Sequence, residues 1–174
     1  HLHALAWGGG EHTITPRRSD DEPERSMGTD ETFGRDTDDP AVVRRELLRL
    51  SSRLAGRMRR AGVAGRTVTL KVRFADFVTI TRSRTLADPT DLATEIYAVA
   101  GELYAALRLE RARIRLVGVR VEGLQDARTA TRQLVLGARE HGWAEAERAV
   151  DRAVHRFGDS IVRPGSLVGA RGRR

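Results

Sequence analysis

One pattern of apolar residues occurs twice in this chain of 174 residues, and the two copies lie 49 positions apart. In each copy the apolar residues recur every third or fourth position, which is the spacing of one face of an α-helix. An Asp-Pro pair opens each pattern, at Asp39-Pro40 and at Asp88-Pro89. Aspartate caps helix N-termini and proline suits the first turn, so we expect Asp39 to cap the first helix. The two stripes are Val43, Leu47, Leu50, Leu54 and Met58, and Leu92, Ile96, Val99, Leu103 and Leu107.

Segments that resemble β-strands flank both predicted helices. They occupy residues 25–33, 66–74, 77–86 and 113–121, with Ala75 and Asp76 as the tight turn between the central two. The predicted order is therefore β-α-β-β-α-β. Both helices are amphipathic, so both can bury their stripes on one face of the sheet. We predict an α+β fold in which a four-stranded antiparallel sheet carries two helices on one face and leaves the other face open.

Strand alternation predicts what the open face carries. Val68, Leu70, Val72 and Phe74 share one parity and should meet the helices, as should Val78 and Ile80 on the partner strand. Arg82 and Arg84 break the alternation, so we place them at the end of their strand or after a bulge. The residues expected on the open face are Thr67, Thr69, Lys71, Arg73, Thr79, Thr81 and Ser83.

The charge of the chain is positive and unevenly distributed. The net charge is +7 and the pI is near 11.1; residues 11–40 carry −6 and residues 41–86 carry +10. This balance indicates an anionic partner such as nucleic acid. Two ordinary explanations stay open: Thr and Arg are common on solvated strands, and the excess of Arg over the single Lys71 is typical of a GC-rich genome.

Composition excludes several other functions. The chain has no cysteine, which excludes disulfides and thiolate metal sites and favours a cytoplasmic location. It has no apolar run long enough for a bilayer, so we expect no membrane partner. His1 and His3 could share a metal, but no third ligand follows at a defined spacing, and we expect no metal site. We find neither a phosphate loop nor a serine elbow, and expect no enzymatic activity from this chain alone.

Three segments together resemble the little finger, or polymerase-associated, domain of Y-family translesion DNA polymerases. They are "RSMGTDETF", "RTVTLKVRFADFVTITRSRTL" and "RIRLVGVRVEGL", within residues 24–124, and the bacterial DNA polymerase IV branch is the most similar. The resemblance implies a reversed ferredoxin-like fold whose open sheet face lies in the major groove of DNA. It also implies a division of the chain into the end of a thumb domain (1–10), a linker (11–24), the little finger (25–123) and a tail (124–174). Because the chain begins at His1, we expect a piece of a longer protein.

The resemblance also implies DNA-contacting residues. The first strand of the family contacts phosphates and matches Ser26 to Thr29, the template-contacting hairpin matches Arg82 to Thr85, and a last-strand arginine matches Arg115, with Arg120 as a further match. With the outward strand positions added, the predicted DNA-binding set is Ser26, Met27, Gly28, Thr29, Thr69, Lys71, Arg73, Thr81, Arg82, Ser83, Arg84, Thr85, Arg115 and Arg120.

The tail contains a second resemblance. "QLVLG", which is Gln133, Leu134, Val135, Leu136 and Gly137, is similar to the peptide by which bacterial polymerases attach to the sliding clamp. The alternative is that Leu134 and Leu136 pack on this domain. Beyond it, Trp143, Ala146, Val150, Val154 and Phe157 form a helical stripe that Gly158 would end, with no function attached.

The leading hypothesis is a DNA-binding module, monomeric, that grips primer-template DNA and aids processivity in damage bypass. Catalytic carboxylates and the magnesium they imply belong to palm and finger domains of the parent polymerase, so we expect no cofactor in this fragment. One alternative is an adaptor that recruits the polymerase to the sliding clamp. The other is an RNA-binding domain of similar strand order, which the lack of aromatic residues at outward strand positions disfavours.

Overall fold

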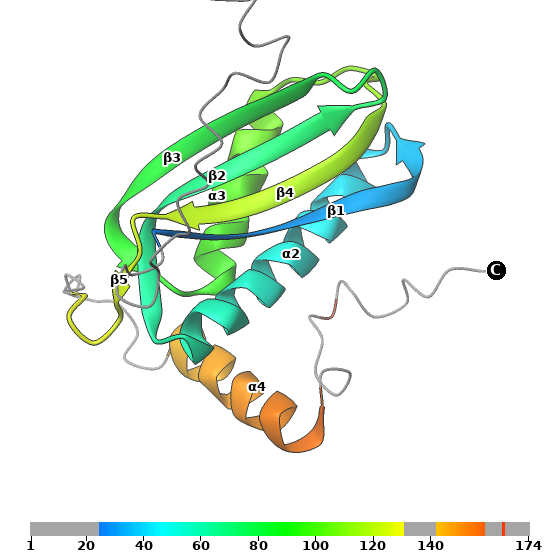
Figure 1. The fold of residues 1–174 in the computed structure, drawn as a ribbon. Helices are drawn as coiled ribbons and strands as arrows, with labels where there is room; N and C mark the ends of the chain where they lie inside the picture. The colour runs from blue at the N-terminus through cyan, green and yellow to red at the C-terminus, as the bar shows by residue number, and fades with distance from the viewer. Residues whose placement is uncertain (1–24, 131–141, 159–164, 166–174) are drawn as a thin grey trace, which may run out of the picture.

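A computed structural model describes residues 25–130, residues 142–158 and residue 165 of the chain. Four long strands form an antiparallel sheet in the order β1-β4-β2-β3, and the short β5 pairs with the start of β2 (Figure 1). The predicted α+β class and strand-helix order are confirmed. The elements are β1 (Ser26–Thr37), α2 (Pro40–Arg60), β2 (Val63–Phe74), β3 (Thr79–Thr90), α3 (Ala93–Ala106), β4 (Ile114–Glu122), β5 (Gln125–Asp126) and α4 (Trp143–Phe157).

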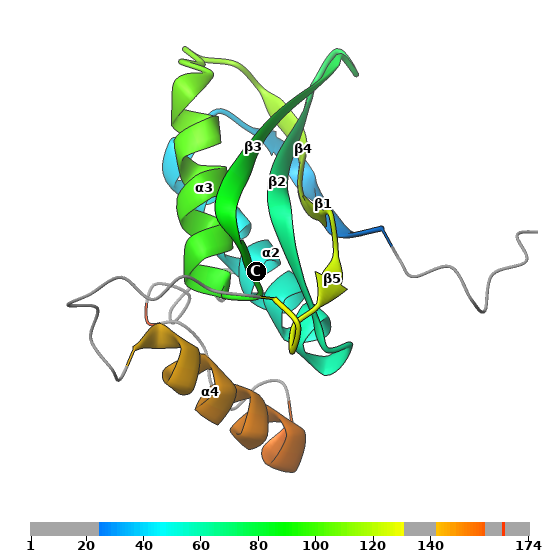
Figure 2. The same ribbon diagram turned by 90° about the vertical axis from the view of Figure 1, so that its left-hand side faces the viewer.

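Helices α2 and α3 both lie on one face of the sheet, and Figure 2 shows them on the same side of the strands. Asp39 caps α2 as predicted, because its Oδ1 accepts a hydrogen bond from the Ala41 N–H at 2.8 Å. The predicted stripe of α2 is fully buried, and the stripe of α3 is buried except at Leu107, which is half-buried. Together with inward residues of β2 and β4 they form one apolar core.

The second helix begins later than its Asp-Pro pair suggests. Strand β3 continues through Pro89 to Thr90, which pairs with Gly65 of β2, so α3 starts only at Ala93. Continued sheet pairing therefore prevents Asp88-Pro89 from starting a helix as Asp39-Pro40 does. The buried hydroxyl of Thr90 accepts a hydrogen bond from the Leu92 N–H at 3.0 Å, but no residue next to α3 caps the helix with its side chain.

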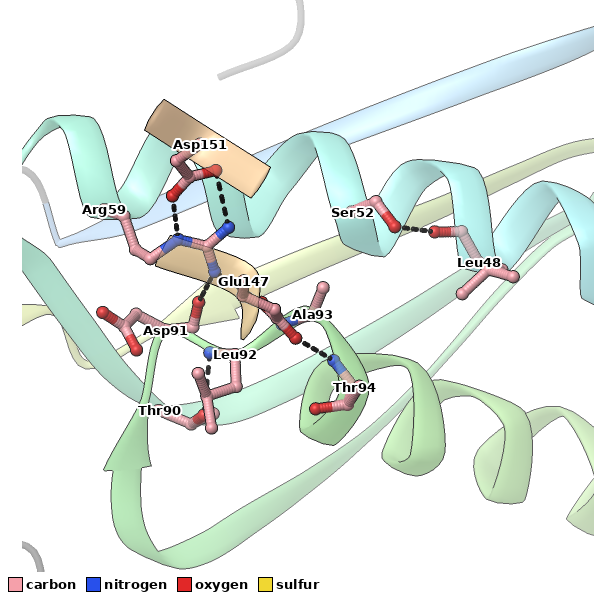
Figure 3. A network of polar contacts seen from close by, with 10 residues as sticks. All are labelled: Leu48, Ser52, Arg59, Thr90, Asp91, Leu92, Ala93, Thr94, Glu147 and Asp151. Atoms are coloured by element: carbon pink, nitrogen blue, oxygen red, sulfur yellow. Dashed lines mark hydrogen bonds and ion pairs between the residues drawn. The ribbon is translucent and has the colours of Figure 1, made fainter. Parts of the chain in front are cut away.

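Helix α4 confirms the predicted helix and its end at Gly158, but its apolar stripe does not pack. Trp143 and Phe157 are 69% and 60% exposed. The helix instead contacts the ends of α2 and α3 through its polar side (Figure 3).

Arg59 is the centre of this polar contact. Its guanidinium donates hydrogen bonds to Asp151, to Glu147 at 2.6 Å and to the Asp91 carbonyl at 2.7 Å (Figure 3). Burial lowers the pKa of Arg59, but the hydrogen bonds and charges of Asp151 and Glu147 outweigh it, so its pKa is raised. Glu147 in turn accepts hydrogen bonds from the N–H groups of Ala93 and Thr94, and thereby caps α3 from a distant part of the chain.

Candidate nucleic-acid interface

The sheet face opposite α2 and α3 is hydroxyl-rich. Residues directly opposite each other on neighbouring strands share a face, and the register places four such pairs of β2 and β3 on the uncovered side. The hydroxyls of Thr67 and Thr85 lie 3.0 Å apart, and Arg73 Nε donates to the Thr79 hydroxyl at 2.9 Å. The pairs are Thr67 with Thr85, Thr69 with Ser83, Lys71 with Thr81, and Arg73 with Thr79.

Strands β4 and β1 extend this open face. Arg120 of β4 lies opposite Thr69 on one side and Gly28 on the other, and its side chain is exposed. A Cβ at Gly28 would approach the Arg120 Cβ to 3.3 Å, so the missing side chain leaves room for this arginine. Ser26 lies two positions from Gly28 and therefore on the same face.

Two acidic residues reduce the positive charge of the open face. Asp30 of β1 forms an ion pair with Lys71 of β2, Oδ2 to Nζ at 2.7 Å, although β4 lies between the two strands. The pair passes over Gly118, where a Cβ would lie 2.1 Å from Asp30 Oδ1, so only glycine fits beneath it. Glu122, opposite both Ser26 and Thr67, is the second acid. The cations of this face at its paired positions are Lys71, Arg73 and Arg120.

The placement expected for Arg82 and Arg84 is wrong. Strand β3 pairs without a bulge from Thr79 to Thr85, so Arg82 lies opposite Leu70 and Arg84 opposite Val68, on the helix-facing side. Arginines are tolerated there because β3 is an edge strand and both side chains reach solvent. Arg84 forms an ion pair with Glu102 of α3, and Arg82 donates to the Thr81 carbonyl at 2.8 Å.

Other members of the predicted set also separate by face. Met27 and Thr29 lie opposite Val121 and Val119, on the helix-facing side, and Met27 packs against the core. Nine residues of the predicted DNA-binding set share the open face: Ser26, Gly28, Thr69, Lys71, Arg73, Thr81, Ser83, Thr85 and Arg120.

Arg115 lies at an irregularity in β4, between the residues that pair with Arg73 and Phe74. Its guanidinium is 3.7 Å from Asp36 of β1 and 4.8 Å from the centre of the Phe77 ring. Phe77 belongs to the turn between β2 and β3, at the end of the open face. The turn falls at Ala75 and Asp76 as predicted, but it extends through Val78, which is 53% exposed and does not meet the helices as expected.

Much of the positive charge counted in the sequence lies away from the open face. Seven of the twelve basic residues in positions 41–86 belong to α2, on the opposite side of the sheet. Three of them, Arg44, Arg45 and Arg53, have exposed side chains on that helix. The sheet face and the outer side of α2 are therefore two separate surfaces that an anion could contact.

Several predicted features fall outside the described residues, namely the thumb end at 1–10, the linker at 11–24 and the peptide Gln133–Gly137. Among the residues that the structure does describe, no group of three or more His, Asp or Glu side chains has the arrangement of a metal site. None of the described helices is long and apolar enough to cross a membrane.

Residues 24–136 match the model of the impB/mucB/samB family C-terminal domain. The chain is 34% identical over 155 residues to DNA polymerase IV of Desulfatibacillum aliphaticivorans, covering 83% of this chain and 37% of that protein. It is 36% identical over 160 residues to DNA polymerase IV 1 of Mesorhizobium japonicum, covering 90% of this chain and 36% of that protein. The chain therefore spans little more than a third of the length of these curated relatives.

Solved structures agree on the fold. The insertion ternary complex of Dbh DNA polymerase aligns over 70% of this chain and 33% of its own, with a TM-score of 0.50 and 18% identity. A Y-family DNA polymerase chimera of Dbh and Dpo4 aligns over the same shares with a TM-score of 0.52 and 18% identity. The family match covers most of the chain, and the α+β fold is consistent with it. The chain is therefore a member of the impB/mucB/samB C-terminal domain family, which is the little finger domain of Y-family DNA polymerases, and it is of the DNA polymerase IV type.

Proposed function

We propose that the open sheet face of this little finger domain binds the sugar-phosphate backbone of primer-template DNA in the major groove and so increases the grip and processivity of a parent polymerase during damage bypass. The observation that carries this proposal is the register: it gathers Ser and Thr hydroxyls and three cations on the one sheet face that α2 and α3 leave uncovered. Hydroxyls and backbone amides contact phosphates, and cations neutralise them, without reading sequence. Such binding weakens steeply as salt rises.

A comparison of two charge-matched variants of the 174-residue chain tests this proposal. Lys71→Ala, Arg73→Ala and Arg120→Ala together remove three cations from the open face. Arg44→Ala, Arg45→Ala and Arg53→Ala remove three from the outer side of α2. Fluorescence anisotropy with a primer-template duplex at several salt concentrations measures the affinity of each.

The open-face variant should lose affinity, and the slope of log affinity against log salt should become shallower by about 0.9 for each phosphate contact removed. The α2 variant should bind DNA with the affinity of the unaltered 174-residue chain. If the α2 variant loses affinity and the open-face variant does not, the DNA surface lies on the helix side. Binding that does not weaken with salt in the unaltered chain would remove the basis of the proposal.

We propose clamp recruitment as a second function, located at Gln133–Gly137. Its support is the sequence pattern, a glutamine followed by spaced aliphatic residues, and the family match that extends to residue 136. Replacing Gln133 and Leu134 with alanine should weaken binding to a bacterial sliding clamp while leaving the DNA affinity unchanged. Equal clamp affinity of the two chains would reject this role. Polymerase activity and magnesium are proposed for the parent protein alone.

A further inference from the structure

The turn between β2 and β3 exposes apolar surface beside the open face. Phe77 is 64% exposed and Val78 is 53% exposed, and of the described residues the other exposed large apolar side chains lie on α4. A solvated phenylalanine gives up the free energy that burial of its ring would supply. The turn therefore places an aromatic ring in solvent where a polar residue would be the ordinary choice.

The backbone at Phe77 is also in an unusual conformation. Its φ is +67°, in the left-handed region that glycine or asparagine occupies more readily than phenylalanine. Hydrogen bonds hold it there: the Phe77 N–H donates to the Phe74 carbonyl at 3.0 Å and the Phe74 N–H to the Val78 carbonyl at 2.9 Å. Asp76 Oδ1 accepts from the Val78 N–H at 3.0 Å. These hydrogen bonds thus hold Phe77 in a strained backbone conformation, and such strain is common at functional positions.

Arg115 of β4 covers one side of the ring, and Arg113 lies near it through a shared acid. The Arg115 guanidinium lies 4.8 Å from the ring centre, within the range of a cation–π contact. Asp36 lies 3.7 Å from Arg115 and 3.8 Å from Arg113, and orients both. The Ala75 N–H donates to the Arg113 carbonyl at 2.9 Å, which ties the turn to the start of β4.

The combination of an exposed ring and adjacent guanidiniums favours a nucleic acid over an apolar protein surface. A protein that covered Phe77 would also desolvate Arg115 and Arg113, which are 41% and 67% exposed. A nucleotide satisfies both groups, because its base stacks on the ring and its phosphate pairs with the guanidinium. The base must be unpaired, since bases inside a duplex already stack on their neighbours.

We propose that Phe77 is a stacking platform for an unpaired nucleobase of the template strand, with Arg113 and Arg115 contacting the adjoining phosphates. This inference rests on the proposed binding of duplex DNA by the open face, and it adds a site for single-stranded template at one end of that face. The Phe77 ring belongs to the turn that follows Arg73 and Thr79, the last pair of facing residues on β2 and β3.

The test uses the 174-residue chain and two DNAs: a blunt duplex, and the same duplex with a single-stranded template extension that contains 2-aminopurine. Stacking quenches the fluorescence of this base. The unaltered chain should quench it, Phe77→Trp should still do so, and Phe77→Ala should not. Val78→Ala is the matched control and should behave as the unaltered chain.

Phe77→Ala should also lose about 5- to 150-fold in affinity for the extended DNA, the range that alanine substitution at base-stacking sites gives, and little for the blunt duplex. An equal loss on both DNAs would instead make Phe77 a positioning residue for Arg115 and overturn the stacking role. Full quenching by Phe77→Ala would also overturn it. Absence of binding to the blunt duplex by the unaltered chain would overturn the proposed function separately. A melting temperature of Phe77→Ala at or above that of the unaltered chain shows that the variant is folded.

Discussion

Arg59 of α2 donates a hydrogen bond to Glu147 of α4 across 2.6 Å, joining residues 88 positions apart in the chain. Both side chains are nearly buried, at 11% and 12% exposed. Glu147 also accepts from the Ala93 and Thr94 N–H groups, at 2.8 and 3.1 Å (Figure 3). One carboxylate thus satisfies a buried arginine and the amino end of a helix that has no cap of its own.

Glu147→Ala is predicted to detach α4 and uncap α3. It removes three hydrogen bonds to charged oxygen, so we expect a loss of about 1–2 kcal/mol in the free energy of unfolding and faster amide hydrogen exchange at Ala93 and Thr94. Glu145→Ala, an exposed glutamate in the first turn of the same helix, is the control and should change little. Unchanged exchange at Ala93 and Thr94 in the Glu147 variant would contradict the capping role.

Gly65→Ala is predicted to destabilise the sheet. Gly65 is buried in β2, and a Cβ there would lie 2.5 Å from Val121 Cγ1 and 2.9 Å from Leu124 Cδ2. Relief requires a shift of packed side chains, which costs about 1–3 kcal/mol. Denaturant unfolding measures this loss, and Gly101→Ala is the matched control, because nothing lies within 4 Å of a Cβ at that helical position. A Gly65 variant as stable as the original chain would show that the strand can move aside.

Asp30→Asn is predicted to strengthen DNA binding. The substitution removes the negative charge that pairs with Lys71 and leaves that cation free for a phosphate. The salt slope of DNA affinity should become steeper, by up to about 0.9 for one additional phosphate contact. Asp38→Asn removes an equal charge from an exposed position between β1 and α2 and provides the comparison. Equal gains for the two variants would indicate a general effect of net charge instead of release of Lys71.

The Asp126 carboxyl should titrate at low pH. Hydrogen bonds from the Arg128 guanidinium and from the Arg128 N–H lower its pKa from 3.8 to about 2. A depressed carboxyl pKa stabilises the folded turn above about pH 4, and that contribution is lost as the pH falls toward 2. NMR titration of the carboxyl carbon measures the pKa directly. In Arg128→Ala it should rise toward 3.8, and an unchanged value would show that the arginine is not its cause.

The sequence predicted those parts of the fold that local patterns encode. The stripe from Val43 to Met58 and the alternation from Thr67 to Arg73 each follow one periodicity, and both lie as expected. The same alternation predicted the wrong positions for Arg82 and Arg84. It assumes that the helix-facing positions of an unbroken strand carry apolar residues. An edge strand relaxes that requirement, and nothing in the sequence indicates which strand lies at the edge.

Contacts between distant residues were beyond the reach of such patterns. The stripe from Trp143 to Phe157 predicted helix α4 but not its contact with the domain, which Arg59 makes with Glu147 and Asp151. The sequence around Gly118 likewise did not predict the Asp30–Lys71 ion pair that crosses this glycine. The exposure of Phe77 likewise follows from the left-handed conformation of the turn. An Asp-Gly pair would have predicted that conformation, but Asp76-Phe77 does not.

The central claim, that the open sheet face binds DNA, has a direct reporter in this chain. Lys71 is the only lysine and lies on that face, so lysine labelled with ¹³C at Cε gives one NMR signal from the surface in question. During titration with primer-template duplex the signal should shift, and the DNA concentration at half-saturation should rise with salt. A signal that stays unmoved while fluorescence anisotropy shows the DNA bound would place the DNA on another surface and contradict the account.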